Sequence, residues 1–321
     1  MFRIIFLITM ILSQIFASSL TKLYQLEGID AVEVELEKQL QDKTYWQESL
    51  KDKDLTLGYY EKEPLIVLIN KEKKTLKLFD LATSAKEPLF EHEVITGLMG
   101  DKQKEGDLKT PIGVYDLLKR FVPQDQFYGQ IAYALSYPNT FDKQQKKTGY
   151  GIWIHGHPLN NKPRYTQNTE GCVVMTNDKL ELFDEDVKGK KAIAIIDEAQ
   201  TPKVLSEDIS ALLAEIFKWR SSWKYSNLDR YLSFYHEDFR RFDGANLEEF
   251  KRMKRAIFSR NEDKKIIFKD ISISPYPDEK YDSMYLLRYY QVYETKNHQF
   301  KGNKEIFLTF KDGKMKILVE N

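Results

Sequence analysis

The sequence predicts an α+β protein in which a mostly β central domain stands between a helical N-terminal segment and a C-terminal domain of helices and strands. Three observations support this fold class. Apolar residues recur at helical spacing before residue 50, short β-rich runs separated by turn residues fill the middle of the chain, and helical patterns followed by strand patterns occupy its last third. The 321 residues suffice for two or more domains, because a domain usually takes about 100–200 residues.

Residues 1–19 have the layout of a secretory signal peptide. Arg3 precedes an apolar run over residues 4–12, and small residues follow at 17–19. The run is shorter than the ~20 residues that a membrane-spanning helix needs. We therefore expect cleavage and export of the mature chain, with a retained N-terminal anchor as the alternative.

The charge balance points to no particular partner. Lys and Arg total 49, and Asp and Glu also total 49. No net field draws such a chain towards nucleic acid or an anionic membrane. We therefore expect no nucleic-acid partner.

Residues 20–63 form the predicted helical N-terminal segment. Its apolar residues follow a roughly helical spacing, and they are too few to build a core of their own. These helices should therefore pack on the next domain or on a second copy of the chain. The second option predicts a homodimer through the N-terminal helices.

Residues 64–200 form the predicted central β domain. Lys71 to Lys74 separate the first two β-rich runs and predict a hairpin, and residues 178–183 form the one expected helix. The stretch from 121 to 148 fits no regular element, and a long ordered loop of this kind is often a lid or a binding surface. The expected strands cover residues 65–69, 75–79, 89–96, 112–118, 151–155, 172–176 and 191–196.

Residues 201–321 form the predicted C-terminal domain. Helices that precede a meander of strands are typical of an α+β domain. The expected helices cover residues 206–220, 228–234 and 247–258, and the expected strands cover 265–274, 284–293, 304–310 and 315–319.

Cys172 and His155 are the residues that predict chemistry. Cys172 is the only cysteine, so it cannot form an internal disulfide. A cysteine attacks a carbonyl carbon as the thiolate, and a histidine within hydrogen-bond reach generates that form. His155 ends one apolar run and Cys172 begins another, so a returning loop would bring two strand ends together. The alternative is a small buried cysteine without a chemical role.

Two glycines strengthen this hypothesis. Gly156 allows close approach of the backbone beside the base, and Gly171 permits a tight turn before Cys172. Amide groups that point from such a turn at the reaction centre would form an oxyanion hole. An ordinary turn glycine is the alternative at position 171.

Three motifs resemble the YkuD-type L,D-transpeptidase catalytic domain over about residues 64–197. They are Lys-Thr-Pro-Ile-Gly-Val-Tyr at 109–115, Ile-His-Gly at 154–156 and Thr-Glu-Gly-Cys-Val at 169–173. The resemblance implies a β-sandwich-like fold and an acyl-enzyme mechanism on peptidoglycan stem peptides, without metal or organic cofactor. It implies Cys172 as nucleophile, His155 as general base, the Gly156 carbonyl as the group that orients the imidazole, and the amides near Gly171 and Cys172 as the oxyanion hole.

The sequence departs from the usual family pattern at two positions. Glu170 replaces a histidine, and Val174 replaces an arginine that is expected to help hold the anionic substrate. Together with Ala-Leu-Ser-Tyr-Pro-Asn at 134–139, these departures resemble the branch of the family that hydrolyses bonds instead of joining chains.

The three-part layout is similar to the L,D-carboxypeptidases that set the shape of helical bacteria. Its last part resembles the cone fold of nuclear transport factor two, for which an unknown ligand in a pocket is one expectation. The resemblance implies a periplasmic hydrolase that removes the terminal D-alanine from a tetrapeptide stem, cutting after the L-centre of meso-diaminopimelate. The residues expected to contact substrate are Tyr133, His157, Arg164, Thr169 and Glu170.

Three alternatives stay open. The same residues with an amine acceptor would make an L,D-transpeptidase. His155, His157 and Cys172 are residue types that bind zinc, which would make a metallohydrolase. A non-enzymatic wall-binding protein would rely on its C-terminal domain and leave the cysteine incidental.

Overall fold

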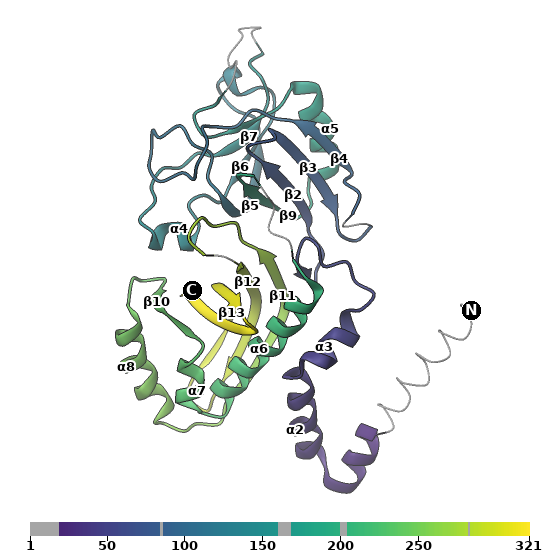
Figure 1. The fold of residues 1–321 in the computed structure, drawn as a ribbon, viewed down its shortest axis with the longest axis vertical. Coiled ribbons are helices and arrows are strands. Elements are labelled where there is room, and N and C mark those ends of the chain that lie inside the picture. Colours follow the sequence, from purple (N-terminus) through teal and green to yellow (C-terminus); the bar gives the residue numbers. More distant parts are fainter. Residues whose placement is uncertain (1–18, 84–85, 160–167, 200–203, 282) are drawn as a thin grey trace, which may run out of the picture.

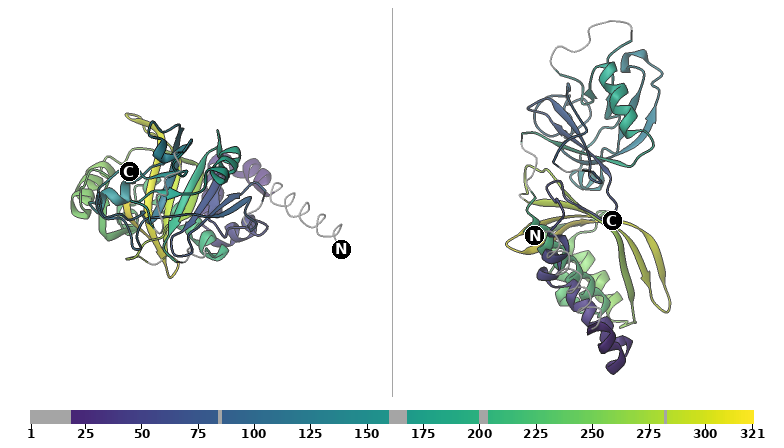
Figure 2. Two further views of the ribbon diagram at one scale, coloured as in Figure 1. Left: turned by 90° about the horizontal axis from the view of Figure 1, so that it is seen from above. Right: turned by 90° about the vertical axis from the view of Figure 1, so that its right-hand side faces the viewer.

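The computed structural model describes residues 19–83, 86–159, 168–199, 204–281 and 283–321, and it contains the three expected parts (Figure 1). The central domain lies at one end of the elongated molecule, and the N-terminal helices run alongside the C-terminal domain (Figures 1 and 2). The expected signal peptide lies outside the described residues except for Ser19. Within the described ranges, no helix is long and apolar enough to cross a membrane.

The N-terminal segment is helical, as predicted. Residues 19–27 are helical, and α2 (Ile29–Leu40) and α3 (Lys43–Leu50) follow. The side chain of Asp42 caps α3 by accepting a hydrogen bond from the amide of Thr44 at 2.8 Å.

The N-terminal helices pack on the C-terminal domain, which is the more distant of the two domains in sequence. The Trp46 ring stacks on Phe217 of α6 (Ser206–Lys224) with a centroid distance of 5.5 Å. Arg220 of the same helix pairs with Glu37. The helices thus find their apolar partner within the chain, and a homodimer through them stays a prediction.

Over the residues that the structure describes, the central domain contains eight strands in the hydrogen-bonded order β4-β3-β2-β9-β5-β6-β7-β8. The pairs β2·β9 and β7·β8 are parallel and the others antiparallel. Helix α5 (Asn177–Val187) buries Leu180, Phe183 and Val187 in the core of this domain. The strands are β2 (Leu65–Asn70), β3 (Thr75–Asp80), β4 (Phe90–Glu93), β5 (Gly113–Phe121), β6 (Ala132–Leu135), β7 (Trp153–His155), β8 (Val173–Val174) and β9 (Ala192–Asp197).

Strand β5 joins the two halves of this sheet. Residues 113–116 pair with β9, whereas residues from Leu117 onward pair with β6. The register shifts between Leu117 and Arg120, and an irregularity of this kind bends a strand. The bend allows β6, β7 and β8 to turn away from the β4-β3-β2-β9 half.

The C-terminal domain combines three helices with a curved sheet, as predicted. Its sheet has the strand order β1-β11-β12-β13-β14-β10, in which β1 is the segment Tyr59–Tyr60 from before the central domain. A core rich in aromatic rings, among them Trp219 and Tyr231, fills the space under the helices. The helices are α6, α7 (Leu228–Leu232) and α8 (Leu247–Phe258), and the strands are β10 (Tyr235–Arg241), β11 (Lys265–Pro275), β12 (Met284–Glu294), β13 (Gln299–Lys311) and β14 (Lys314–Glu320).

Several regular elements escaped the sequence analysis. The stretch 121–148 contains the 3₁₀ turn η1 (Gln126–Tyr128), β6 and α4 (Thr140–Gln144), so the expectation of no regular structure there is wrong. Strand β10 was also not expected. Strand β1 (Tyr59–Tyr60) precedes the central domain in sequence but pairs with β11 of the C-terminal domain.

The two domains share an apolar core. Ile66, Val114 and Ile195 of the central sheet pack in one buried cluster with Leu286 and Phe307 of the C-terminal sheet. A large apolar interface of this kind restrains the relative motion of domains. The two domains therefore keep a fixed position relative to each other.

Candidate active site

His155 and Cys172 lie at the ends of neighbouring strands of the central sheet, as the sequence predicts. His155 ends β7, and Cys172 directly precedes β8, which runs parallel to β7 with Ile154 opposite Val173. This register sets Cys172 beside Trp153. Trp153 and His155 are two residues apart on one strand and therefore face the same side of the sheet. Both His155 and Cys172 line one pocket.

The imidazole of His155 is held by the backbone that follows it. Its Nδ1 lies 2.8 Å from the carbonyl oxygen of Gly156, the contact that the family resemblance implies. A carbonyl oxygen only accepts hydrogen bonds, so Nδ1 carries the proton and Nε2 keeps the lone pair in the neutral ring. This tautomer suits a general base.

Asn177 contacts the segment that follows His155, at residues 156 and 157. Its Nδ2 donates to the carbonyl oxygen of His157 at 3.2 Å. A β-carbon on Gly156 would lie 2.0 Å from Asn177 Oδ1, and one on Gly129 would lie 2.9 Å from it. Glycine is therefore required at 156 for steric reasons, which agrees with the predicted close approach of the backbone.

Gly171 forms the tight turn before the cysteine. Its φ of 128° belongs to the region that favours glycine, and a β-carbon there would lie 2.9 Å from the carbonyl oxygen of Lys109. The amide of Gly171 donates to Thr169 Oγ1 at 3.1 Å, and Thr169 Oγ1 donates to the Cys172 carbonyl at 2.6 Å. The Gly171 amide is thus used within the turn, which corrects its expected part in an oxyanion hole.

The pocket around Cys172 has a volume of about 410 Å³, within the usual range for small-ligand sites. One side is aromatic: the Tyr128 ring meets His155 edge-on at 5.1 Å and Trp153 at 4.9 Å. Much of the remaining lining comes from two loop segments, 102–108 and 149–151, which we call the groove wall. Its lining residues are Lys102, Glu105, Gly106, Leu108, Gly149, Tyr150 and Gly151.

Asp107 organises the first segment of the groove wall. It pairs with Lys102 at 2.7 Å and accepts hydrogen bonds from the amides of Gln103, Lys104 and Lys109. Burial raises the pKa of Asp107, but the Lys102 ammonium and these amides outweigh it and lower the pKa to about 2. The carboxylate is therefore charged at neutral pH and holds the loop in shape.

The predicted substrate-contact residues have different positions. Glu170 is exposed and lines the pocket. His157 is half-buried and is not among the residues that line this pocket. Arg164 lies outside the described residues. Tyr133 is 4% exposed and donates to Asp184, because strand alternation turns it to the face opposite the Ala132–His155 pair. We therefore correct its assignment to an interior residue.

Thr169 also needs correction, because it is 3% exposed and its hydroxyl serves the turn described above. It shapes the backbone before Cys172 and is not a lining residue of the pocket.

The zinc hypothesis finds no ligand set in the part of the chain that the structure describes. No three His, Cys, Asp or Glu side chains gather there in an arrangement that could hold a metal ion. His155 instead directs Nδ1 to a backbone carbonyl.

Sequence reasoning missed Tyr128, Asn177 and the groove wall. Tyr128 lies within the stretch 121–148 and Tyr150 follows it. The position of this stretch directly before His155 was the one available signal that it contributes to the site. Nothing in the sequence indicates that residues 102–108 approach the cysteine.

The C-terminal domain contains a second pocket of about 390 Å³. Lys254 lines it and is 8% exposed, with its ammonium 4.9 Å from the Phe250 ring centroid and 5.2 Å from that of Trp223. Burial lowers the pKa of Lys254. The expected ligand of this domain stays a prediction.

Comparison with known proteins agrees with this geometry. Residues 64–194 match the L,D-transpeptidase catalytic domain family (YkuD), and residues 211–321 match the Cds6 C-terminal NTF2-like domain. The chain belongs to the L,D-transpeptidase family, a family of cysteine enzymes that act on peptidoglycan.

The individual relatives include proteins of the same layout. The crystal structure of Pgp2, the helical cell shape determining protein of Campylobacter jejuni, is 45% identical, covers 88% of this chain and 100% of its own, and superposes with a TM-score of 0.83. Bd1075 of Bdellovibrio bacteriovorus is 26% identical, covers 83% of this chain and 95% of its own, and gives a TM-score of 0.64. YafK of Escherichia coli is 27% identical over 129 residues, which are 39% of this chain and 48% of YafK. The chain thus spans about half the length of that curated relative.

Proposed function

We propose that this protein is a periplasmic L,D-carboxypeptidase that shortens peptidoglycan tetrapeptide stems to tripeptides and so helps to set cell shape. The observation that carries the proposal is the placement of Cys172 and His155 in the lining of one pocket, with the imidazole held by the Gly156 carbonyl. The match to Pgp2, which is described as a determinant of helical cell shape, supports the cellular role.

The first half of the reaction forms an acyl-enzyme. His155 Nε2 takes the thiol proton of Cys172, and the sulfur attacks the carbonyl carbon at the L-centre of the third stem residue. The amide of Cys172 stabilises the negative charge on the carbonyl oxygen. The bond to D-alanine then breaks, and the imidazolium of His155 gives its proton to the leaving amine, so that a thioester on Cys172 remains.

The second half returns the enzyme to its starting state. His155 takes a proton from a water molecule that attacks the thioester carbonyl, and the proton then goes back to the departing sulfur. The products are a tripeptide stem with a new carboxylate and free D-alanine. Only residues of this chain and water take part.

The charges of the groove favour water over a second stem as acceptor. Position 174 faces the same side as Cys172 by strand alternation, and it carries a buried valine in place of a cation. In the described residues, the one cation that lines the pocket is Lys102, which is already paired with Asp107. The pocket therefore offers little to hold the carboxylates of an incoming stem.

Glu170 has a separate part in the proposal. Its exposed carboxylate and that of Glu105 both line the pocket near Cys172. Two carboxylates attract a cationic group, and the free amino group of a diamino acid in the stem supplies one. Glu170 would thus help to select the acyl donor.

Digestion of disaccharide tetrapeptides by the purified mature chain tests this function. The products are identified by mass spectrometry for the wild type and for Cys172→Ala. Loss of one alanine by the wild type alone supports the proposal. Cross-linked products would instead indicate an L,D-transpeptidase, and an intact substrate in both samples would favour a non-enzymatic wall-binding protein.

A further inference from the structure

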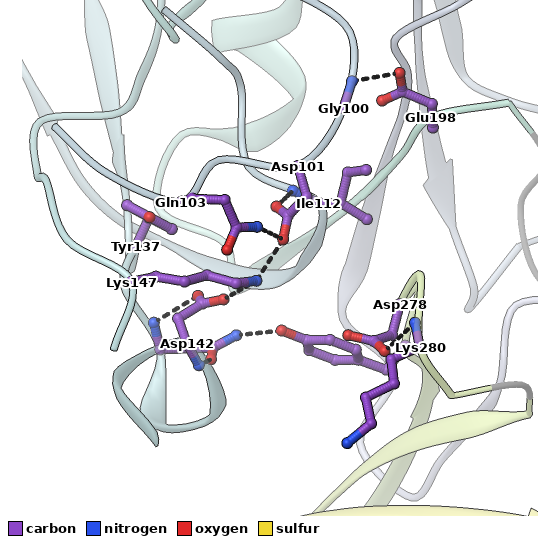
Figure 3. Close-up of polar contacts among 12 residues, drawn as sticks. Gly100, Asp101, Gln103, Ile112, Tyr137, Asp142, Lys147, Glu198, Asp278 and Lys280 are labelled. Carbon is purple, nitrogen blue, oxygen red and sulfur yellow. Dashed lines mark hydrogen bonds and ion pairs between the residues drawn. The ribbon is translucent and has the colours of Figure 1, made fainter. Parts of the chain in front are cut away.

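A chain of buried polar side chains connects the C-terminal domain with the groove wall (Figure 3). It begins at Tyr276, which follows β11 and is 2% exposed. The hydroxyl of Tyr276 accepts a hydrogen bond from Asn139 Nδ2 at 2.9 Å. A β-carbon on Gly113 would lie 2.6 Å from this hydroxyl, so the tip of the tyrosine enters the central domain at the start of β5.

Asn139 also caps α4, so it connects Tyr276 with this helix. Its Oδ1 accepts from the amide of Asp142 at 2.9 Å, and Asp142 Oδ2 accepts from the amide of Asn139 at 3.0 Å. This reciprocal pair is a capping box, which fixes the first turn of the helix. The carboxamide of Asn139 is thus held by the C-terminal domain at its nitrogen and by α4 at its oxygen.

Lys147 links α4 to the loop that carries the groove wall. Its ammonium contacts Asp142 Oδ1 at 3.0 Å and Asp101 Oδ2 (Figure 3). The side chains of Lys147 and Asp142 are 3% and 0% exposed. A buried ammonium between two carboxylates holds a defined position, because separating any of the three leaves an uncompensated charge in the interior.

Asp101 and Lys147 stand where the two segments of the groove wall begin. Asp101 accepts from the amide of Ile112 at 2.8 Å and from Gln103 Nε2 at 3.1 Å. The amide of Thr148 donates to the Gln103 carbonyl at 3.1 Å, which ties the two segments together. Residues 102–108 and 149–151 then line the pocket that contains Cys172.

We propose that Tyr276 of the C-terminal domain is a positioning residue for the groove wall of the active site, acting through Asn139, Asp142 and Lys147. It touches neither the nucleophile nor the base. Loss of its hydroxyl loosens the wall that binds the stem peptide and leaves the Cys172–His155 pair intact. The prediction for the kinetics rests on the proposed function, whereas the prediction for the mobility of the wall does not.

Tyr276→Phe in the full mature chain tests the proposal, because it removes one hydroxyl and keeps the ring. Tyr60→Phe is the matched control. Tyr60 is 5% exposed and lies in the same apolar core between the domains. Its hydroxyl donates to the Leu57 carbonyl at 3.0 Å and contacts Ser274 Oγ of the C-terminal domain at 2.9 Å, instead of bonding to Asn139. Both variants lose one buried hydroxyl at the interface.

The first readout is amide hydrogen exchange of peptides that cover residues 101–112 and 147–151. A single neutral hydrogen bond corresponds to roughly a three- to tenfold change, so Tyr276→Phe should speed exchange there by about this factor and Tyr60→Phe should not. Equal exchange in both variants and the wild type would overturn the proposal, whatever the activity.

The second readout is hydrolysis of the disaccharide tetrapeptide. We expect KM to rise by about three- to tenfold in Tyr276→Phe with kcat within about twofold, and an unchanged rate of Cys172 alkylation by iodoacetamide. If the variant instead showed a lower active fraction and a lower melting temperature with KM unchanged, the role of Tyr276 would be purely structural and the proposal would be refuted. If exchange changes as expected but the wild type does not cleave the tetrapeptide, the proposed function fails and the positioning role stands.

Discussion

Asn177, the first residue of α5, packs directly on the backbone of Gly156. A β-carbon at position 156 would lie only 2.0 Å from Asn177 Oδ1. The carbonyl of Gly156 in turn holds His155 Nδ1 at 2.8 Å. The orientation of the base therefore depends on a contact between two residues that carry no charge.

Gly156→Ala should lower kcat/KM for the tetrapeptide by about 100-fold, because a displacement of about 1 Å near the reacting groups costs this much. The active fraction is counted by alkylation of Cys172, the only cysteine. The double variant Gly156→Ala/Asn177→Ala removes the clash and should regain a large part of the loss. If the double variant instead lost as much activity as Gly156→Ala and Asn177→Ala lose together, a direct clash between the two residues would be refuted.

Gly171→Ala should destabilise the protein by roughly 1–3 kcal/mol and abolish most activity. The residue has a φ of 128°, and the added carbon would meet the Lys109 carbonyl at 2.9 Å. Gly189→Ala is the control, since Gly189 also has positive φ, 78°, but a β-carbon there meets nothing within 4 Å. Urea unfolding should show the larger loss at 171; equal losses would mean that backbone strain alone matters.

Asp107→Asn should destabilise the protein at neutral pH and roughly half as much at pH 3. The folded pKa of about 2 lies below the ordinary 3.8, so the carboxylate contributes stability above pH 3.8 that is lost as the pH falls towards 2. The difference corresponds to about 2 kcal/mol at pH 7. Unfolding of wild type and variant is compared at pH 7 and pH 3, and a difference that does not shrink at pH 3 would refute the assignment.

Arg288→Met should weaken the contact between the domains by roughly 1–3 kcal/mol, because it leaves the half-buried carboxylates of Asp116 and Glu305 without their partner. Arg288 binds Asp116 of β5 at 2.8 Å and Glu305 of β13 at 2.9 Å. Burial lowers the pKa of Arg288, but these carboxylates outweigh it and raise the pKa. Lys301→Met, which breaks a more exposed pair with Glu294, should change the melting temperature little. Similar shifts in both variants would contradict the prediction.

Local patterns explain which elements the sequence predicted. Helix α8 begins and ends at Leu247 and Phe258 as expected, because an amphipathic pattern and the capping box of Asn246 and Glu249 define it. Strand β10 was missed because its sequence, YHEDFRR, buries only Tyr235 and Phe239. Its pairing with β14 at the edge of the sheet supplies what the local pattern lacks.

The same distinction applies to the candidate site. His155, Gly156 and Cys172 lie in two short motifs, so local sequence sufficed to select them. The groove wall depends instead on distant contacts: Lys71 reaches the Thr110 carbonyl at 3.0 Å and pairs with Glu198, which also accepts from the Gly100 amide. No local sequence pattern predicts that segments so far apart in the chain come together. Tyr133 was misassigned because its facing depends on the register of β6.

Under the proposed function, water resolves the acyl-enzyme on Cys172, and digestion of the disaccharide tetrapeptide in ¹⁸O-labelled water with an added D-amino acid distinguishes water from an amine as the acceptor. We expect a tripeptide product that carries one ¹⁸O in its new carboxylate, formed by the wild type and not by Cys172→Ala. A product that instead carries the added D-amino acid and no ¹⁸O would refute hydrolysis and identify the chain as a transpeptidase.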